Sequence, residues 1–408
     1  MLLVGVAKAR VPAEVSAPGN GHNHKAVCAP GQVKGQIRAA QCFSSVETDA
    51  TGTPLVSPTP LATAYGPAQF HTGYNLPKKT PKIPGSRSRK KNTIAIVDAF
   101  WIPTIRADLD TFDSAYGLPA FPRCTTATAT ACIQLYRQDG SLMSTTNHPA
   151  EDDGWGLEID LDVQVAHEIC QNCRINVVLA NDNFFNNLET AVNEASALGS
   201  QEISNSYGAY LYDCSEPGYN HPNKAVVVSS GDSGFGVACP ANLNTVVSVG
   251  GTTLNLSGTN TYLSEQAWNG TGGGCSTTQA AQPWQTSLPN WGATGCGSGR
   301  AMNDVAADAD PSTGANVYDC SYFGLCGFFQ VGGTSLSAPL IAAVYGLAAN
   351  ANTVAYPAAL PYQKLGTSAL HDVTSGSNGS CSPAIQCTAG SGYDLPTGVG
   401  TPHGITAF

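Results

Sequence analysis

The amino-acid sequence predicts an α/β fold with a mostly parallel central sheet flanked by helices. Short apolar, β-branched runs recur along the chain, at residues 92–98, 174–180, 201–207, 225–230 and 245–250. Helical stretches such as residues 185–198 alternate with them, and this alternation is typical of a parallel sheet covered on both faces. Ligands of such sheets lie at the carboxyl ends of the strands. We therefore expect a functional site at that edge.

Length and charge exclude several classes of protein. The 408 residues suffice for one large α/β domain or two average ones, and 42% hydrophobic residues support a packed core. Charged residues make up only 12%, and the net charge of −10 argues against nucleic acid or an anionic membrane as partner. No apolar run approaches the roughly 18 residues that a transmembrane helix needs. We expect a globular monomer.

The N-terminal part of the chain differs from the rest. Residues 1–63 are rich in Pro, Ala, Gly and Thr, with two cysteines and no long helical period. They predict an extended arm, or the remnant of a prosegment, ahead of a main domain at 64–408. Residues 1–10 carry their charges after a short apolar run, which is not the pattern of a secretory leader.

Fourteen cysteines fall into pairs of sequence neighbours. The pairs are Cys28/Cys42, Cys124/Cys132, Cys170/Cys173, Cys214/Cys239, Cys275/Cys296, Cys320/Cys326 and Cys381/Cys387. They predict up to seven local disulfides and an oxidising compartment. The C-x-x-C spacing of Cys170 and Cys173 leaves a redox or zinc motif as the alternative, although no second C-x-x-C accompanies it.

A serine stands at the head of a predicted buried helix. Gly332 and Gly333 allow a tight turn before Ser335, and an apolar, alanine-rich segment follows. Free N–H groups and the helix dipole at such an N-terminus would stabilise an oxyanion beside a serine nucleophile. The alternative is an ordinary helix cap, since Ser and Thr are favoured there.

An acidic segment at residues 152–169 predicts a second helix, capped by Asp152 or Asp153. Glu158 and Asp162 are four residues apart and share one face, whereas Asp160 points roughly 200° round the helix. If the first two are withdrawn from water, one pKa rises and they can share a proton. The alternative is that all three are surface charges.

A third carboxylate, Asp232, lies in the Gly-rich turn 229–234 that directly follows an apolar strand. Such a residue is most often a turn former. Asp98 also ends a strand, but none of the eight histidines has the setting of a serine-activating base, and we interpret His148 and His167 as ordinary polar residues.

Together these motifs resemble the sedolisin (serine-carboxyl) peptidases, in family order across about residues 64–408. They are G-T-S-x-S-x-P at 333–339, E-x-x-L-D at 158–162, S-S-G-D-x-G at 229–234 and S-x-S-x-G at 204–208. The resemblance implies a subtilisin-like three-layer fold. It implies Ser335 as nucleophile, Glu158 as its base, Asp162 as the residue that orients the base, and a protonated Asp232 in the oxyanion hole.

The same resemblance implies binding sites. Ser204, Ser206 and Gly208 would lie on a strand along which a peptide substrate adds. Two C-terminal loops would hold one Ca²⁺ through Asp372, Val373, Gly390, Gly392 and Asp394, because carboxylates and carbonyls on turning glycines suit a hard cation. The alternative is that these are only turn and capping residues. Asp304 and Asp308, in another family-like segment, are expected to be structural.

The expected function is that of a secreted endopeptidase which cleaves polypeptides in acid through an acyl-enzyme. Export is inferred from the cysteines and the resemblance. Two alternatives remain: a neutral subtilisin-like peptidase with a histidine base, and a catalytically inactive, calcium-stabilised binding protein on the same scaffold.

Overall fold

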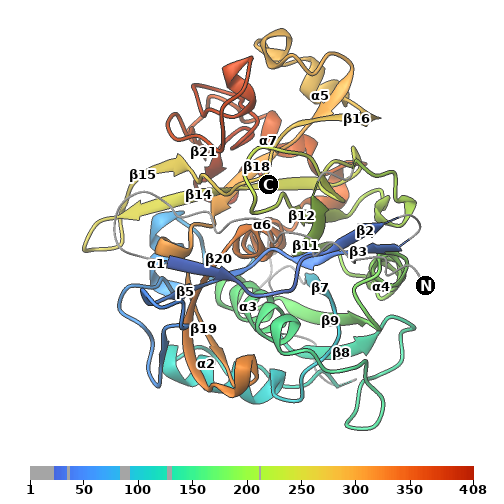
Figure 1. Cartoon of the computed structure of the whole chain (residues 1–408), viewed down its shortest axis with the longest axis vertical. Helices are drawn as coiled ribbons and strands as arrows, with labels where there is room; N and C mark the ends of the chain where they lie inside the picture. Colours follow the sequence, from blue (N-terminus) through green and yellow to red (C-terminus); the bar gives the residue numbers. More distant parts are fainter. Residues whose placement is uncertain (1–22, 35–36, 83–91, 126–130, 211–212) are drawn as a thin grey trace, which may run out of the picture.

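An eight-stranded sheet forms the centre of the computed structural model, which describes residues 23–34, 37–82, 92–125, 131–210 and 213–408 (Figure 1). The strand order is β15-β14-β12-β10-β7-β9-β8, with β18 also paired to β14. All pairs are parallel except β14 with β15. The strands are β7 (Thr93–Ala99), β8 (Ile133–Arg137), β9 (Arg174–Ala180), β10 (Glu202–Asn205), β12 (Ala225–Ser229), β14 (Val247–Leu256), β15 (Tyr262–Ala267) and β18 (Val305–Asp308). The predicted fold class is confirmed.

Two central helices position the site. α3 (Asp153–Ile169) packs against β7 and α6 (Thr334–Ala348), and α6 packs against β10, β12, β14 and β18. Asp152 caps α3, because its side chain accepts the Trp155 N–H. Both helices are buried along almost their whole length. The apolar sequence of α6 requires this, whereas α3 buries carboxyl side chains as well. The other helices are α1 (Pro67–Gly73), α2 (Ile105–Tyr116), α4 (Phe185–Ala197), α5 (Pro283–Thr286) and α7 (Ala359–Tyr362).

The strand predicted over residues 201–207 is in fact two strands in different sheets. β10 ends at Asn205, and β11 (Tyr207–Tyr210) pairs with β4 (Gln41–Cys42) and β13 (Ala238–Cys239). Ser206 lies between them, where the chain leaves the central sheet. This change of sheet brings residues 206–210 next to the N-terminal arm.

The arm is integrated into the molecule rather than standing apart from it. β1 (Asn23–Ala26) pairs with β5 (Ser45–Thr48), which pairs with β20 (Gly327–Gly332), the strand that leads into α6. β6 (Val56–Ser57) and β19 (Ala315–Asp319) also pair with β20. The described part of residues 1–63 contains no helix, as predicted. Smaller two-stranded antiparallel sheets are β2 (Gln32–Lys34) with β3 (Ile37–Ala39), β16 (Cys275–Ala280) with β17 (Gly299–Ala301), and β21 (Leu370–His371) with β22 (Thr401–Pro402).

All seven predicted disulfides are present, with the predicted partners. Cys170 and Cys173 bridge each other directly after α3. The zinc alternative for this C-x-x-C pair is therefore not supported, since both sulfurs are in the disulfide.

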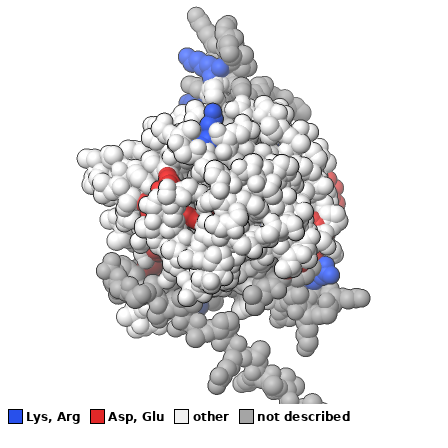
Figure 2. All heavy atoms as spheres, turned by 90° about the horizontal axis from the view of Figure 1, so that it is seen from above, with Lys and Arg blue, Asp and Glu red and all other residues white. Residues whose placement is uncertain are grey.

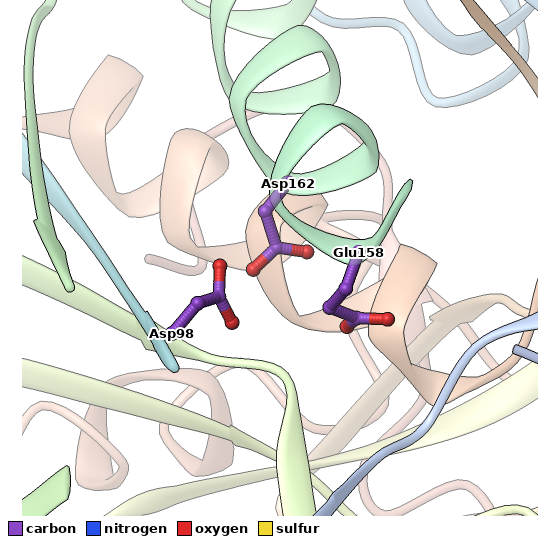
Figure 3. A group of neighbouring side chains, drawn as sticks. All are labelled: Asp98, Glu158 and Asp162. Carbon is purple, nitrogen blue, oxygen red and sulfur yellow. The ribbon is translucent and has the colours of Figure 1, made fainter. Parts of the chain in front are cut away.

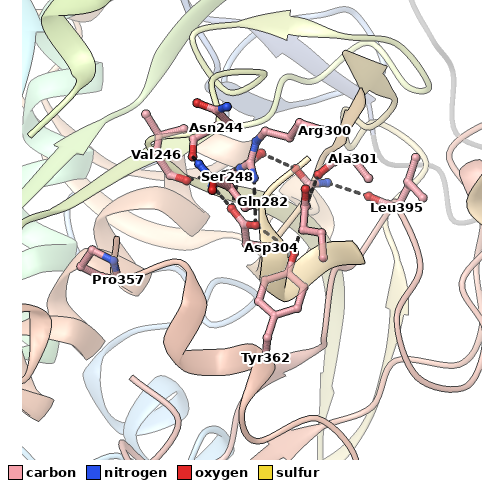
Figure 4. Close-up of polar contacts among 12 residues, drawn as sticks. Asn244, Val246, Ser248, Gln282, Arg300, Ala301, Asp304, Pro357, Tyr362 and Leu395 are labelled. Carbon is pink, nitrogen blue, oxygen red and sulfur yellow. Dashed lines mark hydrogen bonds and ion pairs between the residues drawn. The ribbon is translucent and has the colours of Figure 1, made fainter. Parts of the chain in front are cut away.

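A buried ion pair fixes the sheet beneath α6 (Figure 4). Arg300 donates to Asp304 at 2.6 Å, and both side chains are fully buried. Asp304 also accepts from the Ser248 N–H at 2.8 Å and from the Tyr362 hydroxyl at 2.9 Å. Asp308 accepts from the Leu254 N–H at 3.1 Å. Both aspartates therefore make the structural contacts expected of them.

The surface matches the low share of charged residues. The face drawn in Figure 2 is mostly uncharged, with only scattered basic and acidic side chains. Within the residues described above, no helix combines the length and the apolar character needed to cross a bilayer.

Candidate active site

Ser335 is the second residue of α6 and is fully buried. Gly333, the N-cap, has φ +100°, a conformation that suits glycine and brings the chain sharply from β20 into the helix. The Ser335 N–H donates to the Phe43 carbonyl at 3.0 Å, and its Oγ donates to the Ser206 carbonyl at 2.9 Å. The serine thus stands at a helix N-terminus, as predicted, with a segment of the arm against it.

Three carboxyl groups converge beside this serine (Figure 3). Glu158 and Asp162 extend from successive turns of α3, and Asp98 reaches them from the end of β7. Their carboxylate oxygens lie within 4.8 Å of one another, and all three side chains are fully buried. The alternative that the α3 carboxylates are surface charges is therefore excluded.

Burial is the main cause of the perturbed titration of this cluster. It raises the pKa of Glu158 well above its usual range, and the charge of Asp98 adds to the effect, while the hydroxyls of Ser335 and Ser44 act in the opposite direction. Burial, then Asp98 and Glu158, likewise raise the pKa of Asp162, although the Ser206 hydroxyl donates to it at 2.7 Å. Burial raises the pKa of Asp98 to about 8. The three groups cannot all be ionised near neutrality, so the cluster retains protons.

Asp232 lies in the turn after β12, against the start of α6. Its Oδ1 accepts from the Thr334 N–H and hydroxyl, both at 2.8 Å. The residue is partly exposed, but Oδ2 is covered and has no hydrogen-bond partner within the described part of the chain. Burial raises the pKa of Asp232 to about 7, against the effect of the Thr334 donors. Below that pH the free oxygen carries a proton and can donate.

The three residues predicted to bind substrate have different positions. Ser204 lies on β10, which is paired on both sides and therefore offers no free edge to a peptide. The prediction that Ser204 binds substrate in this way is wrong. The Ser206 hydroxyl donates to Asp162, although the Ser206 carbonyl faces the arm. Gly208 lies on β11, directly opposite Gln41 of the arm. Of the three, the Ser206 carbonyl and Gly208 therefore lie against the arm.

Histidines take no part in the serine's surroundings among the described contacts. His167 lies on α3 but faces Asp113, at 3.3 Å, and stacks on Phe121. His148 stacks on Trp101. Asp98, the residue that a subtilisin-like interpretation would pair with a histidine, has Glu158 and Asp162 as neighbours instead.

The five predicted calcium ligands lie in two loops that meet. Gly392 N–H donates to the Asp372 carboxylate at 3.0 and 3.1 Å, and Gly390 N–H donates to Asp394 at 2.9 Å. Burial raises the pKa of Asp394 to about 7, with a smaller contribution from the charge of Asp372. Neither aspartate forms an ion pair with Lys or Arg within the described ranges. Two carboxylates without a cationic partner, beside the turning backbone of Val373, suit a divalent cation.

Sequence reasoning missed two features of the site. Asp98 was considered only as the partner of a histidine, although its place at the end of a buried parallel strand is a usual position for functional residues. Phe43 and Ser44 carry no motif at all. Their position depends on pairing between segments more than 160 residues apart, and no local pattern encodes that pairing.

Comparisons with known proteins agree with this geometry. No family model matches the chain. Sedolisin of Pseudomonas sp. strain 101 is 32% identical over 221 residues, which are 51% of this chain and 34% of that protein. Kumamolisin of Bacillus sp. strain MN-32 is 32% identical over 302 residues, 65% of this chain and 52% of that protein. A solved structure of Pseudomonas sedolisin, a serine-carboxyl proteinase complexed with two molecules of pseudo-iodotyrostatin, superimposes with a TM-score of 0.65 and 26% identity, covering 84% of this chain and 96% of that one. These matches in sequence and in fold support the sedolisin family for this chain.

The mostly parallel, subtilisin-like architecture matches that of the solved sedolisin structure. The chain spans about a third to a half of the length of these two curated sedolisin-family relatives.

Proposed function

We propose that the protein is a serine-carboxyl endopeptidase that hydrolyses polypeptides in acid. The observation that carries this proposal is the buried cluster of Glu158, Asp162 and Asp98 beside Ser335 at the N-terminus of α6. Carboxylates held at a raised pKa next to a hydroxyl nucleophile are a means of activating it at low pH.

Each residue has a role in acyl transfer. Ser335 attacks the peptide carbonyl, and Glu158 takes the hydroxyl proton and returns it to the leaving amine. Asp162 orients Glu158 and is itself held by the Ser206 hydroxyl. Asp98 adds a third carboxyl, which shares the proton load of the other two.

The oxyanion would be stabilised by the Ser335 N–H and by the protonated carboxyl of Asp232. Because the pKa of Asp232 is raised to about 7, this donor is present in acid and is lost as the pH rises through 7. An ionised Asp232 would repel the oxyanion. A peptidase with a histidine base would not lose activity above neutrality for this reason.

The proposal also includes one bound Ca²⁺ and secretion of the protein. Asp372 and Asp394, with the carbonyls of Val373, Gly390 and Gly392, would hold one Ca²⁺, whose charge offsets the repulsion between the two carboxylates. The seven disulfides indicate an oxidising compartment, which supports secretion.

Cleavage of a denatured protein between pH 2.5 and 8 tests the proposal. The wild type should show an acid optimum that is lost in Ser335→Ala and Glu158→Gln. Activity peaking near neutrality and surviving Glu158→Gln would indicate a histidine base. A folded, calcium-loaded protein without Ser335-dependent cleavage at any pH would favour the inactive binding protein.

A further inference from the structure

A pocket of about 320 Å³ lies between the start of α2 and β8, the edge strand of the central sheet (Figure 1). None of the residues assigned above to the active site lines it. Ile102, which does line it, lies against Gly156 of α3, because a Cβ built on that glycine would collide with the Ile102 side chain. The pocket is therefore next to α3 but separate from the active site.

More than half of the residues that line this pocket are apolar. Trp101, Ile105 and Ile133 are buried in the main core, whereas Leu135 and Met143 are partly exposed. The Met143 N–H donates to the Leu135 carbonyl at 3.1 Å, which extends the wall beyond the edge of β8. A pocket of this size with apolar walls suits the carbon skeleton of a small organic molecule.

Two arginines, Arg106 and Arg123, are the charged residues that line the pocket. The chain has only 19 Lys and Arg residues and a net charge of −10, so the pocket locally reverses the sign of the overall charge. Burial lowers the pKa of Arg106, and the charge of nearby Arg123 adds to this effect, against the charge of Asp110. Two cations brought together in this way favour an anion beside them.

Arg106 also has an unused donor. Its Nη2 donates to Asp110 at 3.3 Å, whereas Nη1 is buried and has no hydrogen-bond partner in the described part of the chain. The Asp110 side chain is 62% exposed, so water weakens its attraction for the guanidinium. A buried, unpaired N–H costs free energy that an anion in the pocket would recover.

The backbone of Arg123 is fixed while its side chain is accessible. Arg123 forms an isolated bridge with Ile133 at the start of β8, and the next N–H, of Cys124, donates to the Ile133 carbonyl at 3.0 Å. The Cys124–Cys132 disulfide ties the same segment to β8. Arg123 is exposed and forms no ion pair with a carboxylate among the residues that the structure describes. Its guanidinium is thus available to a ligand.

We propose that this pocket binds a carboxylate attached to an apolar group, as in an N-acyl amino acid or at the end of a peptide whose last residue is apolar. Arg106 and Arg123 would donate to the carboxylate, because planar guanidinium groups match its geometry. The apolar group would pack against Trp101 and the side chains of β8. An inorganic anion would use the arginines but leave this apolar wall uncovered.

A saturation-transfer NMR titration at pH 6, where an α-carboxyl is ionised, tests the proposal with N-acetylleucine as the probe. We expect a Kd of about 1 mM, in keeping with so small a ligand. The neutral analogue N-acetylleucinamide should bind at least about 10-fold more weakly, because the charge-assisted hydrogen bonds are lost. Equal affinities for the acid and the amide, or no binding of the acid, overturn the proposal. Sulfate that binds as tightly as N-acetylleucine overturns the role of the apolar wall.

Variants of the two arginines locate the binding site. Arg123→Gln should weaken the binding of N-acetylleucine by about 10-fold, and because Arg123 is exposed this variant should fold normally. Arg106→Gln should weaken it by a similar factor. Lys364→Gln is the matched control, since it removes the same charge from an exposed position near α7, well apart from α2 in Figure 1. Unchanged affinity in Arg123→Gln overturns the assignment to this pocket. No probe has to be cleaved, so the result does not depend on the proposed function.

A longer probe separates the two sources of the carboxylate. If the peptide Gly-Gly-Gly-Leu binds as tightly as N-acetylleucine, the end of a peptide is supported as the occupant. If it binds at least about 10-fold more weakly, the pocket is supported as a site for a free acyl amino acid.

Discussion

Helix α3 carries two clusters of buried carboxyl groups, and only one of them lies beside a nucleophile. Glu158 and Asp162 meet Asp98 near Ser335, whereas Asp160, two residues from Glu158, meets Asp108 and Asp319. In each cluster the carboxylate oxygens lie within 4.8 Å of one another. The separation follows from the helix, since residues two apart point in widely different directions.

The two clusters share their electrostatics but not their surroundings. Burial raises the pKa of Asp160 well above its usual range, with the charges of Asp108 and Asp319 adding to it, much as burial does for Glu158. Asp319, however, accepts from the backbone N–H groups of Ser321 at 2.8 Å and Tyr322 at 2.7 Å. The first cluster faces serine hydroxyls instead. A raised pKa is therefore not evidence of catalysis unless a reactive group lies in reach.

The sharpest test of this comparison replaces one carboxyl in each cluster. Glu158→Gln should lower kcat for a denatured protein at pH 4 by about 10³-fold, because the general base is lost. Asp160→Asn should change kcat less than about threefold, since an amide replaces a carboxyl that is protonated in acid. Both are assayed with and without Phe43→Ala, so that the arm affects them equally. Similar losses in the two variants would contradict the assignment of the base.

Asp232 supplies a contrast with both clusters, because its carboxyl is proposed to act as a proton donor. Asp232→Asn keeps a donor but cannot ionise, so kcat/KM at pH 4 should fall by about 10-fold to 100-fold, less than the roughly 10²- to 10³-fold loss that follows removal of an oxyanion donor. The remaining activity should persist above pH 7, where the wild type loses its donor as Asp232 ionises. The measurement is the pH profile of kcat/KM; an unchanged alkaline limb would argue against this role.

Much of the site could be predicted from sequence because its parts are local. The pairing of Glu158 with Asp162, the Asp152 cap and the helix-leading Ser335 depend on spacing within one turn or one helix. The disulfides join near neighbours. Ser206 could not be placed, because its hydroxyl reaches Asp162 only where the chain leaves β10 for β11.

Local sequence patterns also could not predict the second carboxyl cluster or the position of the arm, because both depend on contacts between distant segments. Asp108 and Asp319 lie on α2 and β19, far from Asp160 in sequence, and tertiary packing alone brings them together. Phe43 reaches Ser335 because β4 pairs with β11, a strand more than 160 residues away in sequence. Periodicity indicates which face of an element is buried, but not which distant element covers it.

Changes in the second cluster, around Asp160, should alter the stability of the fold, whereas changes in the first cluster, around Glu158, should alter kcat. In the native state Asp160 holds its proton well above the pKa of an unfolded aspartate, so its contribution to stability is complete below about pH 4 and is lost as the pH rises. The loss is about 1.4 kcal/mol for each pH unit over which only the unfolded residue is ionised. Asp160→Asn should therefore raise Tm relative to wild type at pH 7 but not at pH 3.5, measured by calorimetry. An equal shift at both pH values would contradict this linkage.

In addition to the two clusters, the carboxyl pair Asp372 and Asp394 should be balanced by a cation rather than by retained protons. We expect EDTA at pH 6 to lower Tm by several degrees, since a ligand at 100 times its Kd stabilises the native state by about 2.7 kcal/mol. Asp394→Asn should lower Tm and abolish the EDTA effect, while Asp139→Asn, in an exposed turn, should keep it. Calorimetric titration with Ca²⁺ measures the binding directly. A wild-type Tm that responds to neither EDTA nor Ca²⁺ would mean that hydrogen bonds from neighbouring groups, such as Gly390, Gly392 and Thr397, hold these carboxylates without a cation.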